Sequence, residues 1–191
     1  KVREDNPTAE GYTIYHPQKH SLADQIAQYR AAEKIIGLDG SAFHLFGFVG
    51  KPNQEVAVIL RRNSNVFNSL KCQIVEFASI SPTLVDAVSA DWIPQHKNRP
   101  GRYSFGQLDF DAVRSQLMST GFITGAHQWR VPRFREMKRS MEDFGRSKGI
   151  DYIRVQKAPP KSAQARARAA AHNPKSQPPN QQPSPKQEHV V

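Results

Sequence analysis

The amino-acid composition changes abruptly after Val155, and this change limits how much of the chain can form a hydrophobic core. Seven of the 14 prolines lie in residues 159–191, a stretch with no aromatic residue and no Leu, Ile or Met. Such a segment cannot bury enough apolar surface to offset the conformational entropy that it would lose on ordering. We therefore expect a disordered, basic, Pro/Ala/Gln-rich tail over residues 156–191. About 155 residues remain, enough for one domain with a core.

The N-terminal residues 1–20 are mostly polar, and we predict that they form an irregular arm. Apolar and polar residues alternate briefly over 12–16, which is typical of a short edge strand that Pro17 would end. Ser21 and Asp24 then form the S-x-x-D pattern that caps a helix. The folded domain is therefore predicted to span residues 21–155, and its first helix is expected to end at Gly37.

The apolar runs predict a mixed α+β domain. Residues 42–50 and 55–61 are rich in aromatic and β-branched residues and flank a turn with Pro52 and Asn53, which indicates a β-hairpin. Further strands are expected at 72–78 and 150–155. Further helices are expected at 82–91 and 109–120, the second capped by Asp109 and ended by Gly121. Together with the helix described next, these elements predict one domain in which about four helices pack on a central β-hairpin or small antiparallel sheet.

The most informative segment is 130–148, which combines an apolar stripe with a basic flank. Phe134, Met137, Met141 and Phe144 recur at helical spacing, so they share one side of a predicted helix over 132–146. Pro132 suits the first turn of that helix, and Gly145 or Gly149 suits its end. The apolar stripe is expected to be buried, which would leave the basic flank in water.

The positive charge of the chain is concentrated in two places. The sequence has 27 Lys and Arg against 17 Asp and Glu, a net charge of +10. Residues 130–148 carry +4 and residues 157–191 carry +5, which leaves +1 for all the others. Clustered positive charge beside a basic tail is the electrostatic pattern of proteins that bind a phosphate backbone.

We therefore predict a nucleic-acid-binding protein without catalytic activity. The expected contacts lie on the predicted helix and on the loop 93–107, where basic and aromatic residues alternate as they do in single-strand binders. The candidate residues are Arg133, Arg135, Lys138, Arg139, Arg146, Lys97, Arg99, Arg102 and Tyr103. The sequence does not decide between DNA and RNA, and it indicates no cofactor and no metal ion.

Three alternatives stay open. A structural or protein-interaction module would use the basic helix to bind an acidic protein and the tail as a tether. A metal-dependent phosphodiester enzyme would use the D-x-D pair Asp109 and Asp111, although acidic residues are also favoured in a first helical turn. A strand-interrupted helix-turn-helix would pair 109–120 with 132–146, but the eleven or so residues between them exceed the usual turn.

The remaining sequence signals concern the cellular compartment. One cysteine, Cys72, excludes an intrachain disulfide and a cysteine-rich zinc site, and its apolar neighbours predict a buried thiol. No apolar run reaches the length of a membrane span, and the polar N-terminus shows no signal peptide. We expect a reducing, cytoplasmic protein. Because the chain begins with Lys, we also expect it to be processed or cut from a longer one.

Overall fold

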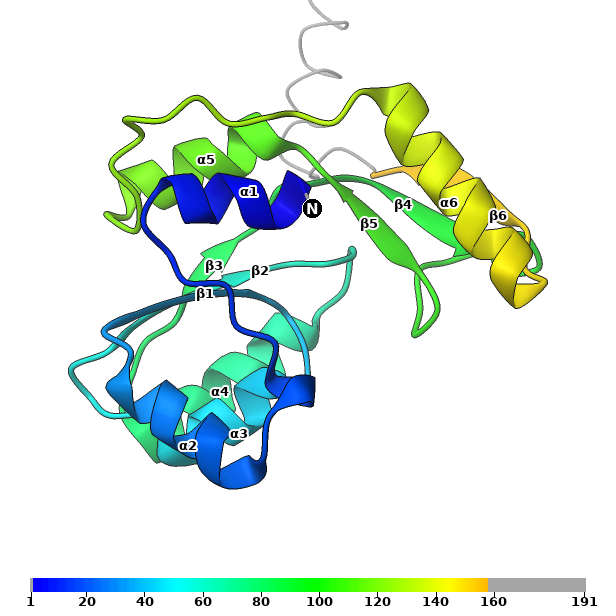
Figure 1. Cartoon of the computed structure of the whole chain (residues 1–191). Coiled ribbons are helices and arrows are strands. Elements are labelled where there is room, and N and C mark those ends of the chain that lie inside the picture. The colour runs from blue at the N-terminus through cyan, green and yellow to red at the C-terminus, as the bar shows by residue number, and fades with distance from the viewer. Residues whose placement is uncertain (1, 158–191) are drawn as a thin grey trace, which may run out of the picture. The chain divides into compact units, whose positions relative to one another are not determined.

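The structure is a computed structural model, and it describes residues 2–157. Six α-helices and six β-strands follow one another in this part of the chain (Figure 1). The helices are α1 (Val2–Ala9), α2 (Leu22–Ala31), α3 (Ala42–Val49), α4 (Val66–Ala78), α5 (Phe110–Ser119) and α6 (Phe134–Lys148). The strands are β1 (Lys34–Leu38), β2 (Glu55–Ile59), β3 (Thr83–Val85), β4 (Val88–Pro94), β5 (Phe105–Leu108) and β6 (Tyr152–Gln156).

Three strands form a parallel sheet in the order β1-β2-β3. Ile36 lies beside Ala57 in the register of β1 and β2, and Val58 lies beside Leu84 in that of β2 and β3. Parallel neighbours need a crossover connection, and here α3 and α4 supply the two crossovers. All three strands therefore end at the same edge of the sheet.

Each face of the parallel sheet packs against its own hydrophobic core. The side chains of β2 alternate, so that Val56 and Val58 belong to the core with α3 and α4, whereas Ala57 belongs to the core with α5. Figure 1 shows α2, α3 and α4 on one side of this sheet and α5 on the other. Because both faces are covered, the strands read as continuous apolar runs in the sequence.

The other three strands form an antiparallel sheet in the order β5-β4-β6. β4 is its central strand, and Trp92 lies between Phe105 of β5 and Arg154 of β6. Gly106 of β5 donates its N–H to the carbonyl of Arg61, which follows β2, at 2.6 Å. This close backbone approach holds the antiparallel sheet against the end of the parallel one.

The predicted mixture of helices and strands is confirmed, and so are several element boundaries. Ser21 caps α2 by accepting a hydrogen bond from the N–H of Asp24, and Asp109 caps α5. Gly149 ends α6 in the left-handed conformation, whereas Gly145, the other predicted stop, lies inside the helix. The predicted strand at 55–61 corresponds to β2.

The predicted central β-hairpin is wrong. Residues 42–49 form helix α3, which buries Phe43, Phe46 and Gly47 at helical spacing, so β2 pairs with β1 instead. The strand expected at 72–78 is the second half of α4. The helix expected at 82–91 is replaced by β3 and the first part of β4. Short, continuously apolar runs fit a buried helix and a buried strand equally well. This explains why two of the predicted strands are helices and one predicted helix is a pair of strands.

The chain termini also differ from the prediction. The N-terminal arm contains helix α1 and a 3₁₀ turn at Pro17–Lys19, and residues 12–16 form no strand. The first predicted helix ends at Ala31, and Gly37 lies in β1. Gln156 belongs to β6, so the predicted start of the tail is too early. The remainder of that tail lies outside the described residues.

Candidate nucleic-acid interface

Helix α6 lies along the antiparallel sheet (Figure 1). Contacts between aromatic side chains hold it there. The ring of Phe134 stacks on Trp92 of β4 at a centroid separation of 6.4 Å. At the other end of the helix, Phe144 meets the edge of Phe105 at 5.1 Å and also contacts Tyr152. The helix is therefore docked, as its apolar stripe predicts.

The apolar stripe of α6 is covered less completely than expected. Phe134 remains 48% exposed and Phe144 remains 37% exposed. The sheet below has only three strands, so it offers a narrow surface to a helix of 15 residues. The predicted apolar stripe is thus only partly buried, because part of the apolar surface of α6 stays open to solvent.

The predicted basic residues of α6 are all exposed. Their residue numbers are Arg133, Arg135, Lys138, Arg139 and Arg146. Two of them have acidic partners on the helix: Lys138 lies 3.7 Å from Glu142, and Arg146 pairs with Asp143. Exposed pairs of this kind contribute little to stability and are readily exchanged for other anions. Within residues 2–157, Arg135 and Arg139 belong to no ion pair.

The structure places the basic loop beside the C-terminal end of α6. The loop joins β4 to β5, and its residue Gln95 donates an N–H to the carbonyl of Asp151 at 2.8 Å, just before β6. The predicted contact residues Lys97, Arg99, Arg102 and Tyr103 are exposed. Since α6 ends at Lys148, the loop cations and the last turn of α6 lie at the same end of the antiparallel sheet.

The predicted residues therefore form an elongated surface, which we call the α6–loop surface (Arg133 to Lys148 with Lys97 to Tyr103). Arg146 lies near the loop, whereas Arg133 and Arg135 lie at the far end of the helix. A helix of this length spans roughly 22 Å. The helix-turn-helix alternative is wrong, because α5 packs on β3 and α6 packs on β6 rather than on α5.

The D-x-D pair has a structural role in α5. One carboxylate oxygen of Asp109 accepts hydrogen bonds from the N–H groups of Asp111 and Ala112 at 3.1 and 3.0 Å, which is the geometry of a helix N-cap. No group of three His, Cys, Asp or Glu side chains suitable for a metal ion occurs in the described part of the chain. Cys72 is exposed on α4 rather than buried as predicted.

Sequence reasoning missed a polar cluster at the ends of the parallel strands. Asp39 follows β1 and is almost fully buried, and its carboxylate lies 3.1 Å from Nε of Arg61, which follows β2. The Asp39 carboxylate also accepts the backbone N–H of Arg61 at 3.2 Å. Burial raises the pKa of Asp39 despite this guanidinium. Only the parallel pairing of β1 with β2 brings these two residues together, so a predicted hairpin could not reveal them.

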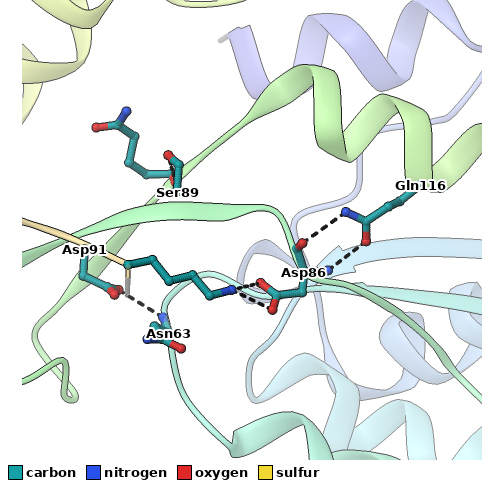
Figure 2. A network of polar contacts seen from close by, with 7 residues as sticks. Asn63, Asp86, Ser89, Asp91 and Gln116 are labelled. Carbon is teal, nitrogen blue, oxygen red and sulfur yellow. Dashed lines mark hydrogen bonds and ion pairs between the residues drawn. The ribbon is translucent and has the colours of Figure 1, made fainter. Parts of the chain in front are cut away.

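A second buried acid, Asp91, lies in the middle of β4. Its carboxylate accepts the backbone N–H of Asn63 at 3.0 Å, as Figure 2 shows. Burial raises the pKa of Asp91 as well. The segment after β2 is thus bound by a carboxylate from each sheet, Asp39 and Asp91, which fixes the position of one sheet relative to the other. The alternation of hydrophobic residues in β4 gives no sequence signal for this role.

Comparison with known proteins finds no matching protein family, no matching curated protein and no matching solved structure. Among the described residues, no helix is both long and apolar enough to cross a membrane. The geometry and charge of the surfaces described above are therefore what indicates a function for this chain.

Proposed function

We propose that this protein binds nucleic acid through the α6–loop surface, without catalysing a reaction. The observation that carries the proposal is the meeting of two exposed basic segments, α6 and the loop after β4, at one end of the antiparallel sheet. The segment 130–148 alone has a net charge of +4, and Lys97, Arg99 and Arg102 lie in a loop segment without acidic residues. Such a surface attracts a phosphate backbone over a length of several nucleotides.

The chemistry of the side chains supports this assignment. Arg135 and Arg139 are one helical turn apart, so their guanidinium groups can contact neighbouring phosphates, and each guanidinium can donate two parallel hydrogen bonds. Tyr103 adds an exposed ring, 61% accessible, on which an unpaired base can stack. Phosphate contacts position a nucleic acid without reading its sequence, so we expect weak sequence preference.

The second candidate function is a protein-interaction module. One observation favours it: Phe48 and Phe77 on α3 and α4 are each 62% exposed, and their ring centroids are 4.8 Å apart. Exposed aromatic pairs and half-covered apolar stripes are common where proteins meet. In this case the basic residues of α6 would contact an acidic protein, and the tail would be a tether. The phosphodiester-enzyme alternative gains no support, since Asp109 caps α5.

Fluorescence anisotropy with labelled single- and double-stranded DNA and RNA, titrated with salt, tests the proposal. The whole chain is compared with a version that ends at Lys157, so that the contribution of residues 158–191 is measured separately. We expect salt-sensitive binding that the shorter version retains. The four probes together decide between DNA and RNA. Absence of binding at low salt would reject the proposal in favour of a protein partner.

Charge reversal then locates the surface. Replacing Arg135, Lys138 and Arg139 with Glu should abolish binding, because the phosphate-contacting flank becomes acidic. The matched control replaces Lys19, Lys51 and Lys71 with Glu, since these lysines are exposed elsewhere and the change in net charge is identical. Equal losses in the two variants would mean that only net charge matters, and retained binding in the first variant would reject α6 as the contact.

A further inference from the structure

The structure contains a cavity of about 560 Å³ at the free edge of the parallel sheet. It lies between β1 and the N-terminal segment 12–17, and its volume falls within the range of small-molecule binding sites. The proposed nucleic-acid interface includes none of its lining residues. The cavity is therefore a separate feature of the molecule.

The walls of the cavity come from both hydrophobic cores. Phe43 and Phe46 of α3 line it from the core on one face of the sheet. Phe110 and Trp129 line it from the core on the other face. The cavity thus crosses the edge of β1 and opens onto both faces. A molecule bound there would lie in the plane of the sheet, with apolar side chains above and below it.

The edge of β1 supplies directed hydrogen-bonding groups to this cavity. The carbonyl of Glu33 and the N–H of Asp39 both bond to β2, so the odd-numbered residues of β1 face that strand. Because peptide groups alternate along a strand, the N–H and C=O of Ile36 point away from β2. Ile36 lines the cavity, and β2 is the only strand paired with β1 in residues 2–157. At Ile36, this edge therefore presents a donor and an acceptor side by side.

Two tyrosines in the cavity wall have hydroxyl groups that find no partner among residues 2–157. The hydroxyl oxygens of Tyr15 and Tyr29 are buried, and neither forms a hydrogen bond within the described part of the chain. Tyr29 is only 7% exposed. Buried hydroxyl groups are nearly always hydrogen-bonded in proteins, so these two groups indicate a missing polar partner.

The charged residues of the wall, Glu4 and Lys34, each lie beside another ionisable side chain. His16 lies 3.4 Å from Glu4, and Lys34 lies 3.3 Å from Glu55. Both pairs are at least partly exposed at the rim of the cavity. The interior contributes apolar surface, peptide groups and two tyrosine hydroxyl groups but no net charge, so a charged ligand would lose its hydration without gaining a counter-ion.

We propose that this cavity binds a neutral, flat, mostly apolar small molecule that carries a hydrogen-bond donor beside an acceptor. The donor and acceptor pair with the C=O and N–H of Ile36, and the ring system lies between the aromatic side chains of the two cores. Cyclic amides and nitrogen heterocycles with a lactam edge belong to this class. The N-terminal segment forms the outer wall, so the arm that precedes α2 is part of the binding site.

The test uses the bicyclic lactam isocarbostyril and its N-methyl derivative with the full chain. Both are flat and similar in size, but only the first has an N–H donor. Titration calorimetry measures affinity, and the fluorescence of Trp129 reports occupancy because this residue lines the cavity. We expect saturable one-to-one binding of isocarbostyril and at least tenfold weaker binding of the N-methyl compound. No binding, or equal binding of the two compounds, would overturn the proposal.

A pair of neighbouring substitutions locates the bound molecule. Ala32 lines the cavity and Ala31 does not, although both lie at the C-terminal end of α2. Ala32→Phe should weaken isocarbostyril binding at least tenfold by filling the cavity, and Ala31→Phe should leave it unchanged. Equal affinities of these two variants would place the compound elsewhere and overturn the proposal. If Ala32→Phe does not fold, the comparison of the two compounds still decides.

Discussion

The ammonium group of Lys157 donates to both carboxylate oxygens of Asp86, each at a distance of 2.7 Å. Asp86, which Figure 2 labels, follows β3 of the parallel sheet, whereas Lys157 follows β6 of the antiparallel sheet. This ion pair therefore joins the ends of the two sheets. The backbone of Asp86 also exchanges two hydrogen bonds with the side chain of Gln116 on α5. One residue thus links both sheets and a helix.

Removing this ion pair should destabilise the protein slightly. The side chains of Lys157 and Asp86 are 27% and 40% exposed, so solvent screens their attraction. We expect Lys157→Met to lower the free energy of unfolding by about 1 kcal/mol or less, as for other partly exposed pairs. Urea denaturation measures the change, and added salt should reduce it. Lys51→Met, at an exposed turn, is the control. An equal loss of stability in that variant would show that the ion pair is not the cause.

The buried acids predict how stability changes with pH. Burial raises the pKa of Asp39 in the folded protein above its ordinary value of 3.8, so the folded state holds this proton more tightly than the unfolded state. The free energy of unfolding should therefore fall as pH rises from about 4 through the folded pKa, and stay level above it. Asp91 acts in the same direction.

Asp39→Asn should flatten this pH dependence. The side-chain oxygen of Asn can still accept the N–H of Arg61, but it has no proton to lose. Denaturation midpoints of wild type and variant, measured from about pH 4 to about pH 7, give the comparison. The two curves should converge at acidic pH, where Asp39 is protonated. Parallel curves would show that Asp39 ionises as easily in the folded protein as in the unfolded chain.

The local chemistry of the sequence was sufficient to predict several helix ends but not the pairing of the strands. Ser21, Asp109 and Gly149 act through hydrogen bonds or backbone angles within a few residues, so their roles follow from the sequence. The run at 42–50 is apolar on nearly every residue, which also fits a strand. Phe43 and Phe46 are three residues apart and both buried, which is the spacing of a helix. Only the packing of this segment against α4, on the same face of the sheet, selects the helix over a strand.

The candidate sites also differ in how well the sequence predicts them. The basic residues of α6 and of the loop are exposed, as their charge predicts, since Arg and Lys rarely lose water without a partner. The pairing of Asp39 with Arg61 and the cavity at Ile36 depend on which strands are neighbours. Neighbours in a parallel sheet are distant in sequence, and no periodicity within 34–59 identifies them.

Two glycines in the β4–β5 hairpin should respond very differently to alanine. A Cβ on Gly106 would lie 2.6 Å from the carbonyl oxygen of Arg61, whereas no atom of the described part of the chain lies within 4 Å of one on Gly101. The contact at Gly106 is with backbone, which cannot rotate away. We expect Gly106→Ala to cost about 1–3 kcal/mol of stability, as overpacking does, and Gly101→Ala to change little. Thermal unfolding of both variants measures this, and an undisturbed Gly106→Ala protein would contradict the close approach of the two sheets.

Substitutions at Tyr103 distinguish base stacking from charge attraction in the proposed function. Its ring is exposed in the loop, so it can stack on an unpaired base but not on the paired bases inside a duplex. We expect Tyr103→Ala to weaken single-strand binding by about 1–3 kcal/mol and to leave duplex binding almost unchanged. The dependence of affinity on salt should stay the same, because no phosphate contact is lost. Tyr103→Phe keeps the ring and should bind like wild type. Equal losses on single strands and duplexes would mean that Tyr103 supports the loop rather than contacting a base.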